Sequence, residues 1–115
     1  MSFKLRVTDP AKDDIRQIVT WWSEHRDAGQ AQRWQIGLET RVRTLRQRPT
    51  SRPLAPESRY SSVPVRQLNY GVRGRPTHRV LFIVTENEVV VLRVLHLAQD
   101  ALAPEDLGFD GLSNP

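Results

Sequence analysis

The sequence has no cysteine, so it can form neither a disulfide framework nor the usual cysteine-based zinc ribbons and fingers. Its longest apolar runs, such as Val80–Val84 and Val89–Leu92, are far too short to span a bilayer. The chain opens with alternating apolar and basic residues, whereas a secretory leader places a charged segment before an apolar one. We therefore expect an unprocessed, soluble, cytoplasmic protein.

Lysine is also scarce, because fifteen of the seventeen cationic residues are arginine. The planar guanidinium binds carboxylates and phosphates with two parallel hydrogen bonds, and it stacks on aromatic rings and nucleobases. A preference for arginine codons over the whole chain would produce the same ratio. It would not explain why the arginines are segregated along the chain.

Ten arginines lie between Arg41 and Arg79, where the only acidic residue is Glu57. Residues 1–40 carry six basic and six acidic side chains, and residues 80–115 carry one arginine against six acids. The formal charge of +4 is therefore the sum of segments charged 0, +9 and −5. Such a distribution indicates a polyanionic partner or a strongly acidic protein partner.

The first half of the sequence predicts a strand and two helices. Apolar and basic residues alternate over residues 3–8, and Thr8 then supplies an N-cap before Pro10. The first helix is expected to end at Ala28-Gly29, and the second to run from residue 30 to about residue 47, where Pro49 stops it. Its apolar stripe is Ala31, Trp34, Leu38, Val42 and Leu45, and its outward end is basic, with Arg41, Arg43, Arg46 and Arg48.

The second half predicts a loop over residues 50–64 and then three antiparallel strands over residues 65–70, 77–85 and 88–96. A short helical turn is expected near Pro104, followed by a flexible tail over residues 108–115. The predicted fold is therefore α+β, in the order β-α-α-β-β-β. An antiparallel curled sheet, joined by the first strand, would pack one face on the helical hairpin and leave its other face open.

Three pieces of this layout carry a resemblance. They are residues 7–11 with the Asp14-Ile15 pair, the segment 65–71, and the hairpin that joins residues 78–82 to residues 91–96. Together they resemble the RelE/ParE superfamily of toxins from type II toxin–antitoxin modules, over roughly residues 3–107. The resemblance implies a single toxin domain over residues 1–107, which requires no cofactor and no metal. It also implies neutralisation by an acidic antitoxin of the ParD, RelB or Phd type.

The superfamily contains two activities. RelE-like members cleave mRNA in the ribosome, with basic residues on the sheet and often a C-terminal tyrosine or histidine. ParE-like members poison DNA gyrase and lack that catalytic set. Beyond His96 this chain reads Leu97-Ala98-Gln99-Asp100, and both of its tyrosines come earlier, at Tyr60 and Tyr70. The resemblance is therefore closer to the ParE branch, which implies plasmid stabilisation and gyrase inhibition by binding.

Two residues are candidates for ribonuclease chemistry. RNA cleavage without a metal needs a proton acceptor, a proton donor and a cation beside the phosphorane. A two-residue turn at Glu86-Asn87 would pair Arg79 with Val94 and place His96 diagonally beside Arg79 on one face. His78 and Arg93 would then lie on the helix-packed face with Leu95, and we expect Arg93 to reach the edge or to pair with an acid. Alternatively, Arg79 is a cation that faces solvent or the antitoxin, and His96 ends its strand and forms only a local hydrogen bond.

The remaining candidates concern binding. Arg66, Arg73, Arg75, Arg79, Arg93, Arg46 and Arg48 are the expected partner-contact residues. Trp21 cannot share the centre of its helix stripe with Trp22, so it is either at the core edge or an exposed interface anchor. A basic nucleic-acid-binding module without toxicity stays open as an alternative, although no helix-turn-helix, zinc or RNP pattern occurs. An antitoxin-like or scaffolding partner with no target of its own is the other alternative.

Overall fold

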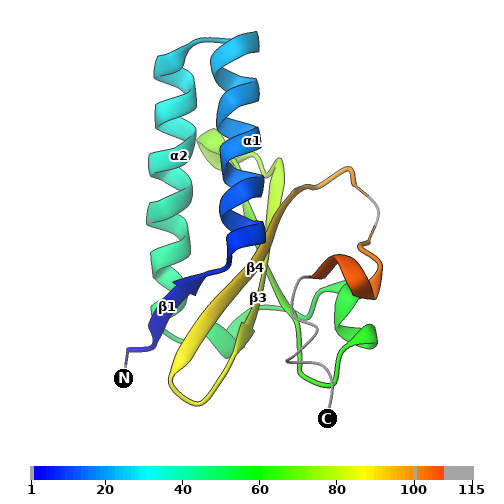
Figure 1. The fold of residues 1–115 in the computed structure, drawn as a ribbon. Coiled ribbons are helices and arrows are strands. Elements are labelled where there is room, and N and C mark those ends of the chain that lie inside the picture. Colours follow the sequence, from blue (N-terminus) through cyan, green and yellow to red (C-terminus); the bar gives the residue numbers. More distant parts are fainter. Residues whose placement is uncertain (1, 100, 108–115) are drawn as a thin grey trace.

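The computed structural model describes residues 2–99 and 101–107. The elements follow the predicted order (Figure 1): β1 is Lys4–Val7, α1 Asp9–His25, α2 Ala28–Arg43, β2 Arg66–Tyr70, β3 His78–Val84 and β4 Glu88–His96. Short 3-10 turns lie at Thr44–Arg46, Pro49–Ser51, Pro56–Tyr60, Val72–Gly74 and Pro104–Leu107. The α+β class and the order of the predicted strands and helices are confirmed, but α2 ends at Arg43 instead of near residue 47, and Thr44–Arg46 form a 3-10 turn. No helix in the described ranges is long and apolar enough to cross a membrane.

The first helix begins at its predicted cap, but the break between the two helices comes earlier than expected. Thr8 Oγ1 accepts a hydrogen bond from the Ala11 N–H and caps α1. The prediction that Gly29 ends α1 is wrong, because Gly29 lies in the first turn of α2. Asp27 is the cap of α2, since its carboxylate accepts from the Gln30 N–H at 2.8 Å. That bond also lowers the pKa of Asp27 below its ordinary value.

The sheet has the order β1-β4-β3-β2 and is mixed rather than purely antiparallel. β2, β3 and β4 form the predicted antiparallel meander, whereas β1 runs parallel to β4, with Lys4 opposite Glu88 and Val7 opposite Val91. No tight turn links β1 to β4, so their direction is not constrained by a hairpin and the intervening chain permits parallel pairing.

A β-bulge changes the register of the β3–β4 hairpin. Near the turn, Val84 lies opposite Val89, as predicted. The register shifts by one residue between Leu81 and Phe82, so that Arg79 lies opposite Leu95, not Val94. A shift of one residue reverses the face of every side chain beyond it. The predicted placement of Arg79 and His96 on one face is therefore wrong.

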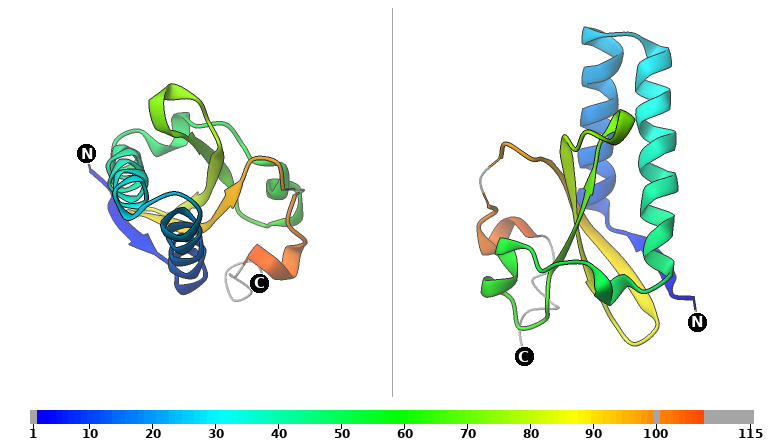
Figure 2. Two further views of the ribbon diagram at one scale, coloured as in Figure 1. Left: turned by 90° about the horizontal axis from the view of Figure 1, so that it is seen from above. Right: turned by 180° about the vertical axis from the view of Figure 1, so that it is seen from behind.

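The sheet is covered on both faces, which corrects the expectation of an open face. On one side, the helices pack Trp34, Leu38 and Val42 against Val80, Phe82 and Val91. On the other side, a second core joins Leu81, Ile83, Val90, Leu92 and Leu95 to Ala55, Val65 and Leu107 from the connecting loop and the C-terminal segment. Figure 2 shows the sheet between the hairpin and these segments. Leu95, expected on the helix side, therefore belongs to the second core. The predicted tail over residues 108–115 lies outside the described residues.

Candidate functional site

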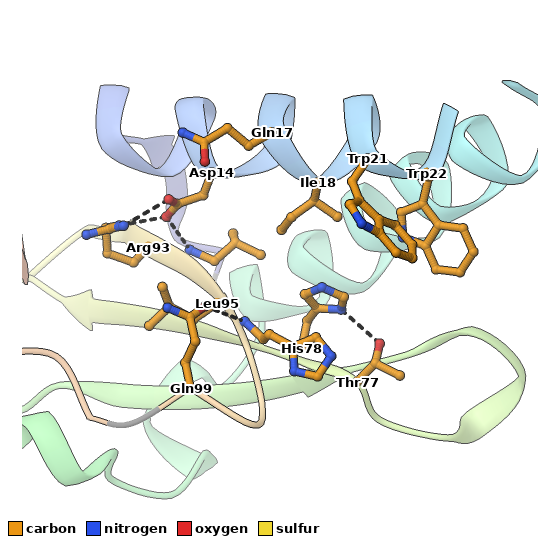
Figure 3. A pocket seen from close by; sticks show the side chains of 12 residues that line it. Asp14, Gln17, Ile18, Trp21, Trp22, Thr77, His78, Arg93, Leu95 and Gln99 are labelled. Carbon is orange, nitrogen blue, oxygen red and sulfur yellow. Dashed lines mark hydrogen bonds and ion pairs between the residues drawn. The ribbon is translucent and has the colours of Figure 1, made fainter. Parts of the chain in front are cut away.

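A groove of about 490 Å³ lies between α1 and the C-terminal half of β4 (Figure 3). It exists because β1 ends at Val7, opposite Val91, and leaves the rest of that β4 edge without a neighbouring strand. The start of α1 bonds to the next part of the edge instead. Thr8 donates from its N–H to the Val91 carbonyl and from its hydroxyl to the Leu92 carbonyl. The Val94 N–H donates to the Asp14 carboxylate at 2.9 Å.

Asp14 and Arg93 close one end of the groove with a paired salt bridge. Arg93 Nε and Nη2 lie 2.6 and 2.9 Å from the two carboxylate oxygens of Asp14. Arg93 also donates to the Asp106 carbonyl at 2.6 Å. The hydrogen bond to Asp14 raises the pKa of Arg93 despite partial burial. The expectation that Arg93 pairs with an acid is confirmed, and its guanidinium is consequently engaged within the chain.

The rest of the groove is apolar and aromatic. Ile18, Trp21 and Trp22 descend from α1 toward His78 and Leu95 on the sheet (Figure 3). Trp21 is 47% exposed, stacks on His25 and meets Trp22 edge to face. The two open possibilities for Trp21 are therefore resolved in favour of exposure. An exposed indole beside a hollow is typical of an interface anchor.

The bulge brings two histidines together on the groove face. His78 and His96 are directly opposite, with ring centroids 5.1 Å apart. His78 is buried and its Nδ1 lies 2.8 Å from the Thr77 hydroxyl. Burial, assisted by the charge of His96, lowers the pKa of His78 to about 4, so His78 is neutral at pH 7. His96 is exposed, and its Nδ1 accepts from the Ala98 N–H at 3.0 Å.

Arg79 lies on the other face of the sheet, in a buried ion pair. Its Nη1 and Nη2 lie 2.9 and 2.6 Å from the carboxylate oxygens of Glu57, and the two residues are 4% and 0% exposed. Glu57 also accepts from the Leu102 N–H at 2.8 Å. Burial raises the pKa of Glu57, but the bonds from Arg79 and Leu102 outweigh it, and the pKa lies below its ordinary value. Arg79 thus ties the loop and the C-terminal segment to the sheet.

The other predicted contact arginines do not form one cluster. Arg46 and Arg48 are exposed just after the end of α2, where Arg46 Nε donates to the Phe3 carbonyl. Arg73 and Arg75 are exposed in the turn between β2 and β3. In Figure 1 that turn lies beside the helical hairpin, away from the base of α2. Arg66 is half-buried on β2 and donates to the Arg52 carbonyl.

The sequence and the fold both match known toxins. Residues 5–101 match the family of the ParE toxin of the type II toxin–antitoxin system parDE. The chain belongs to the ParE toxin family. The fold is similar to the chromosomal ParDE system of P. aeruginosa, with 23% identity, a TM-score of 0.65 and coverage of 83% of this chain and 96% of that one. It is also similar to a free variant of E. coli toxin RelE, with 14% identity, a TM-score of 0.53 and coverage of 85% and 86%. No curated protein matches the sequence.

Sequence reasoning missed several groups that shape this toxin's candidate site. The sequence places Asp14 in the first helix and gives no sign that it bonds to both the backbone and the arginine of β4. Glu57 gave a usable signal, because it is the lone acid within the arginine-rich segment. A single acid among ten arginines is a natural candidate for a buried pair. The pairing of His78 with His96 had no signal in the sequence, since it depends on the bulge.

Proposed function

We propose that this ParE-family toxin inhibits DNA gyrase by binding it and that an acidic antitoxin holds the toxin inactive. The observation that carries the proposal is the environment of Arg79, the best candidate for a catalytic cation. Arg79 is 4% exposed, paired with Glu57, and separated from His96 by the sheet. Stabilising a phosphorane requires a cation that touches the phosphate, and a buried, paired guanidinium does not meet that requirement.

The groove between α1 and β4 is the proposed docking site for the antitoxin. It offers the exposed Trp21 and an apolar floor, and its Asp14–Arg93 pair is already neutralised. The basic surface at the end of α2, including Arg46 and Arg48, favours a partner with acidic residues outside its apolar anchors. A disordered antitoxin segment that folds on binding could follow both surfaces. The similar P. aeruginosa structure is that of a ParDE system, which supports a partner of this type.

Ribosome-dependent RNA cleavage is the second candidate, and the histidine pair favours it. His96 is exposed with Nε2 directed away from its local bond, and His78 lies beside it as a neutral imidazole. An imidazole of this kind could exchange a proton with an RNA hydroxyl. In the described residues, however, the groove's only guanidinium is Arg93, which is bound to Asp14.

Inducible expression in a bacterial host separates the two activities. A gyrase poison should stop growth, induce the DNA-damage response and leave mRNA intact, and purified toxin should trap gyrase-cleaved DNA. The variant His96→Gln should keep this toxicity. Site-specific mRNA cuts that disappear in His96→Gln would overturn the proposal in favour of RNA cleavage. Harmless expression of the folded wild-type protein would count against both.

Antitoxin docking is tested by truncating Trp21. The variant Trp21→Ala should weaken binding of the cognate antitoxin at least tenfold in a calorimetric titration, because an exposed aromatic anchor commonly carries that much affinity. Tyr60→Ala is the matched control, since Tyr60 is 44% exposed but lies on the loop outside the groove. Equal binding by both variants would place the antitoxin elsewhere.

A further inference from the structure

A second pocket lies between the first half of α2 and the turn that follows β2. Its volume is about 430 Å³, within the range of sites that hold small molecules. Its lining is Trp22, Gln30, Arg33, Trp34, Val72 and Arg73. This lining combines two cations and two indoles and includes no carboxylate.

The two arginines reach the pocket from different elements and are both exposed. Neither Arg33 nor Arg73 forms an ion pair with the described residues. Asp27 lies close enough to Arg33 to have its pKa lowered by that charge, but its carboxylate oxygens accept from the N–H and the amide of Gln30. Two guanidiniums are therefore available to a ligand.

The backbone of the turn holds Arg73 in an unfavourable conformation. Its φ is 62°, in the left-handed region that residues with a Cβ rarely adopt, and Gly74 follows at φ 72°. Glycine or asparagine would adopt this conformation at lower cost. Strained residues of this kind are concentrated at ligand sites, where the position of the side chain matters more than local strain.

The indole of Trp34 provides an independent indication of a ligand. Its Nε1 is the one buried side-chain polar atom in the described ranges without a hydrogen-bond partner. A buried N–H without an acceptor is costly and normally finds a partner. Trp34 also lines this pocket, so the unpaired donor belongs to one of the pocket's own residues.

We infer that this pocket binds a nucleotide, with the phosphate on Arg33 and Arg73 and the base against the half-buried ring of Trp22. Paired guanidiniums bind phosphate oxygens bidentately, and indole rings stack on bases of any sequence. An acidic peptide would use the arginines but would leave the aromatic wall without a planar partner. The nucleotide is either free or part of a single strand. The inference does not require gyrase to be the target.

The test uses purified toxin at low salt and four probes. Adenosine 5′-monophosphate should quench tryptophan fluorescence saturably, whereas adenosine and ribose 5-phosphate should each bind at least tenfold more weakly. A fluorescein-labelled oligodeoxyadenylate, followed by anisotropy, shows whether a strand binds more tightly than the free nucleotide. Binding to either form supports the inference, and the ratio of the two affinities identifies the source.

Exposed arginines allow variants that leave the core intact. Arg33→Gln and Arg73→Asn should each lower the affinity about tenfold, and asparagine tolerates the left-handed backbone at position 73. Arg41→Gln is the matched control, because it removes the same charge from an exposed position of α2 outside the pocket and should change the affinity less than about twofold.

Four results would overturn the inference. The first two are that neither the nucleotide nor the strand binds, and that ribose 5-phosphate binds as tightly as the nucleotide. The third is that Arg41→Gln lowers the affinity as much as Arg33→Gln does. The fourth is that an equal concentration of an acidic peptide fully displaces the nucleotide. The measurement contains no gyrase, so its failure and a failure of the gyrase assay are distinguishable.

Discussion

Replacing Glu57 by glutamine removes one charge of the buried ion pair while preserving the size of the side chain. Arg79 would keep its charge at 4% exposure, and its side-chain acceptors would both be neutral: the amide oxygen of the introduced glutamine and that of Gln67 at 3.3 Å. Breaking one side of a buried pair costs about 3–5 kcal/mol, because the other charge is left uncompensated. Glu57 also receives the Leu102 N–H, so the anchoring of the C-terminal segment should weaken as well.

A loss of that size is large for this protein. Domains of roughly this length have a free energy of unfolding of about 5–15 kcal/mol, and each kcal/mol lowers Tm by about 4 °C or more. We therefore expect Glu57→Gln to lower Tm by at least about 12 °C. Thermal and urea unfolding, followed by circular dichroism, measure the change.

Two further variants make the result specific. Glu88→Gln breaks the exposed pair with Arg6 and should cost less than about 1 kcal/mol. The double variant Glu57→Leu/Arg79→Met replaces both charges and should recover most of the loss, because replacing a buried pair by apolar residues is often close to neutral. A cost for Glu57→Gln no larger than that for Glu88→Gln would refute the reasoning. So would a double variant less stable than either single one.

Three other changes have defined outcomes. The pKa of His78 lies at about 4 instead of 6.5, so between these pH values the unfolded chain binds a proton that the folded chain does not. The free energy of unfolding, measured by urea melts, should therefore fall by up to about 3 kcal/mol as the pH drops from about 6.5 to 4. The variant His78→Phe should flatten this pH dependence. Gly37→Ala would place its Cβ inside contact distance of the buried Tyr70 hydroxyl, so it should lower Tm in the wild type and lower it less in a Tyr70→Phe background, where the nearest ring carbon is 3.3 Å away. Asp14→Asn weakens the bidentate bond to Arg93 and should cost about 1–3 kcal/mol in urea unfolding, and an unchanged midpoint would contradict the assigned contact.

Much of the fold followed from local patterns. The alternation before Thr8, the cap at Thr8 itself and the apolar stripe of α2 each act over a few residues, so they can be read from a single sequence. The errors occurred where two local signals in the sequence conflicted. Gly29 was interpreted as a helix end, but the Asp27 side chain bonds to Gln30 and begins the next helix before it.

The candidate site was less predictable, because its geometry depends on one residue of register. The sequence contains no marker for the bulge between Leu81 and Phe82, yet this bulge moves Arg79 away from His96 and brings His78 beside it. The second core was also hard to predict from the sequence. Ala55 and Leu107 cover the far face of the sheet from the connecting loop and the C-terminal segment, which have no strand periodicity of their own.

The sequence by itself therefore determined the order of the elements, the helix-packed core and the family resemblance, since these depend on periodicity and on motifs that are contiguous in the chain. The tertiary structure alone decided which arginines are available to a partner. Of the ten between positions 41 and 79, it buries Arg79 against Glu57 and leaves Arg73 exposed beside a pocket that Arg33 also lines. The physical reason is that the buried ion pair joins residues that lie 22 positions apart, and sequence patterns do not encode contacts at that separation.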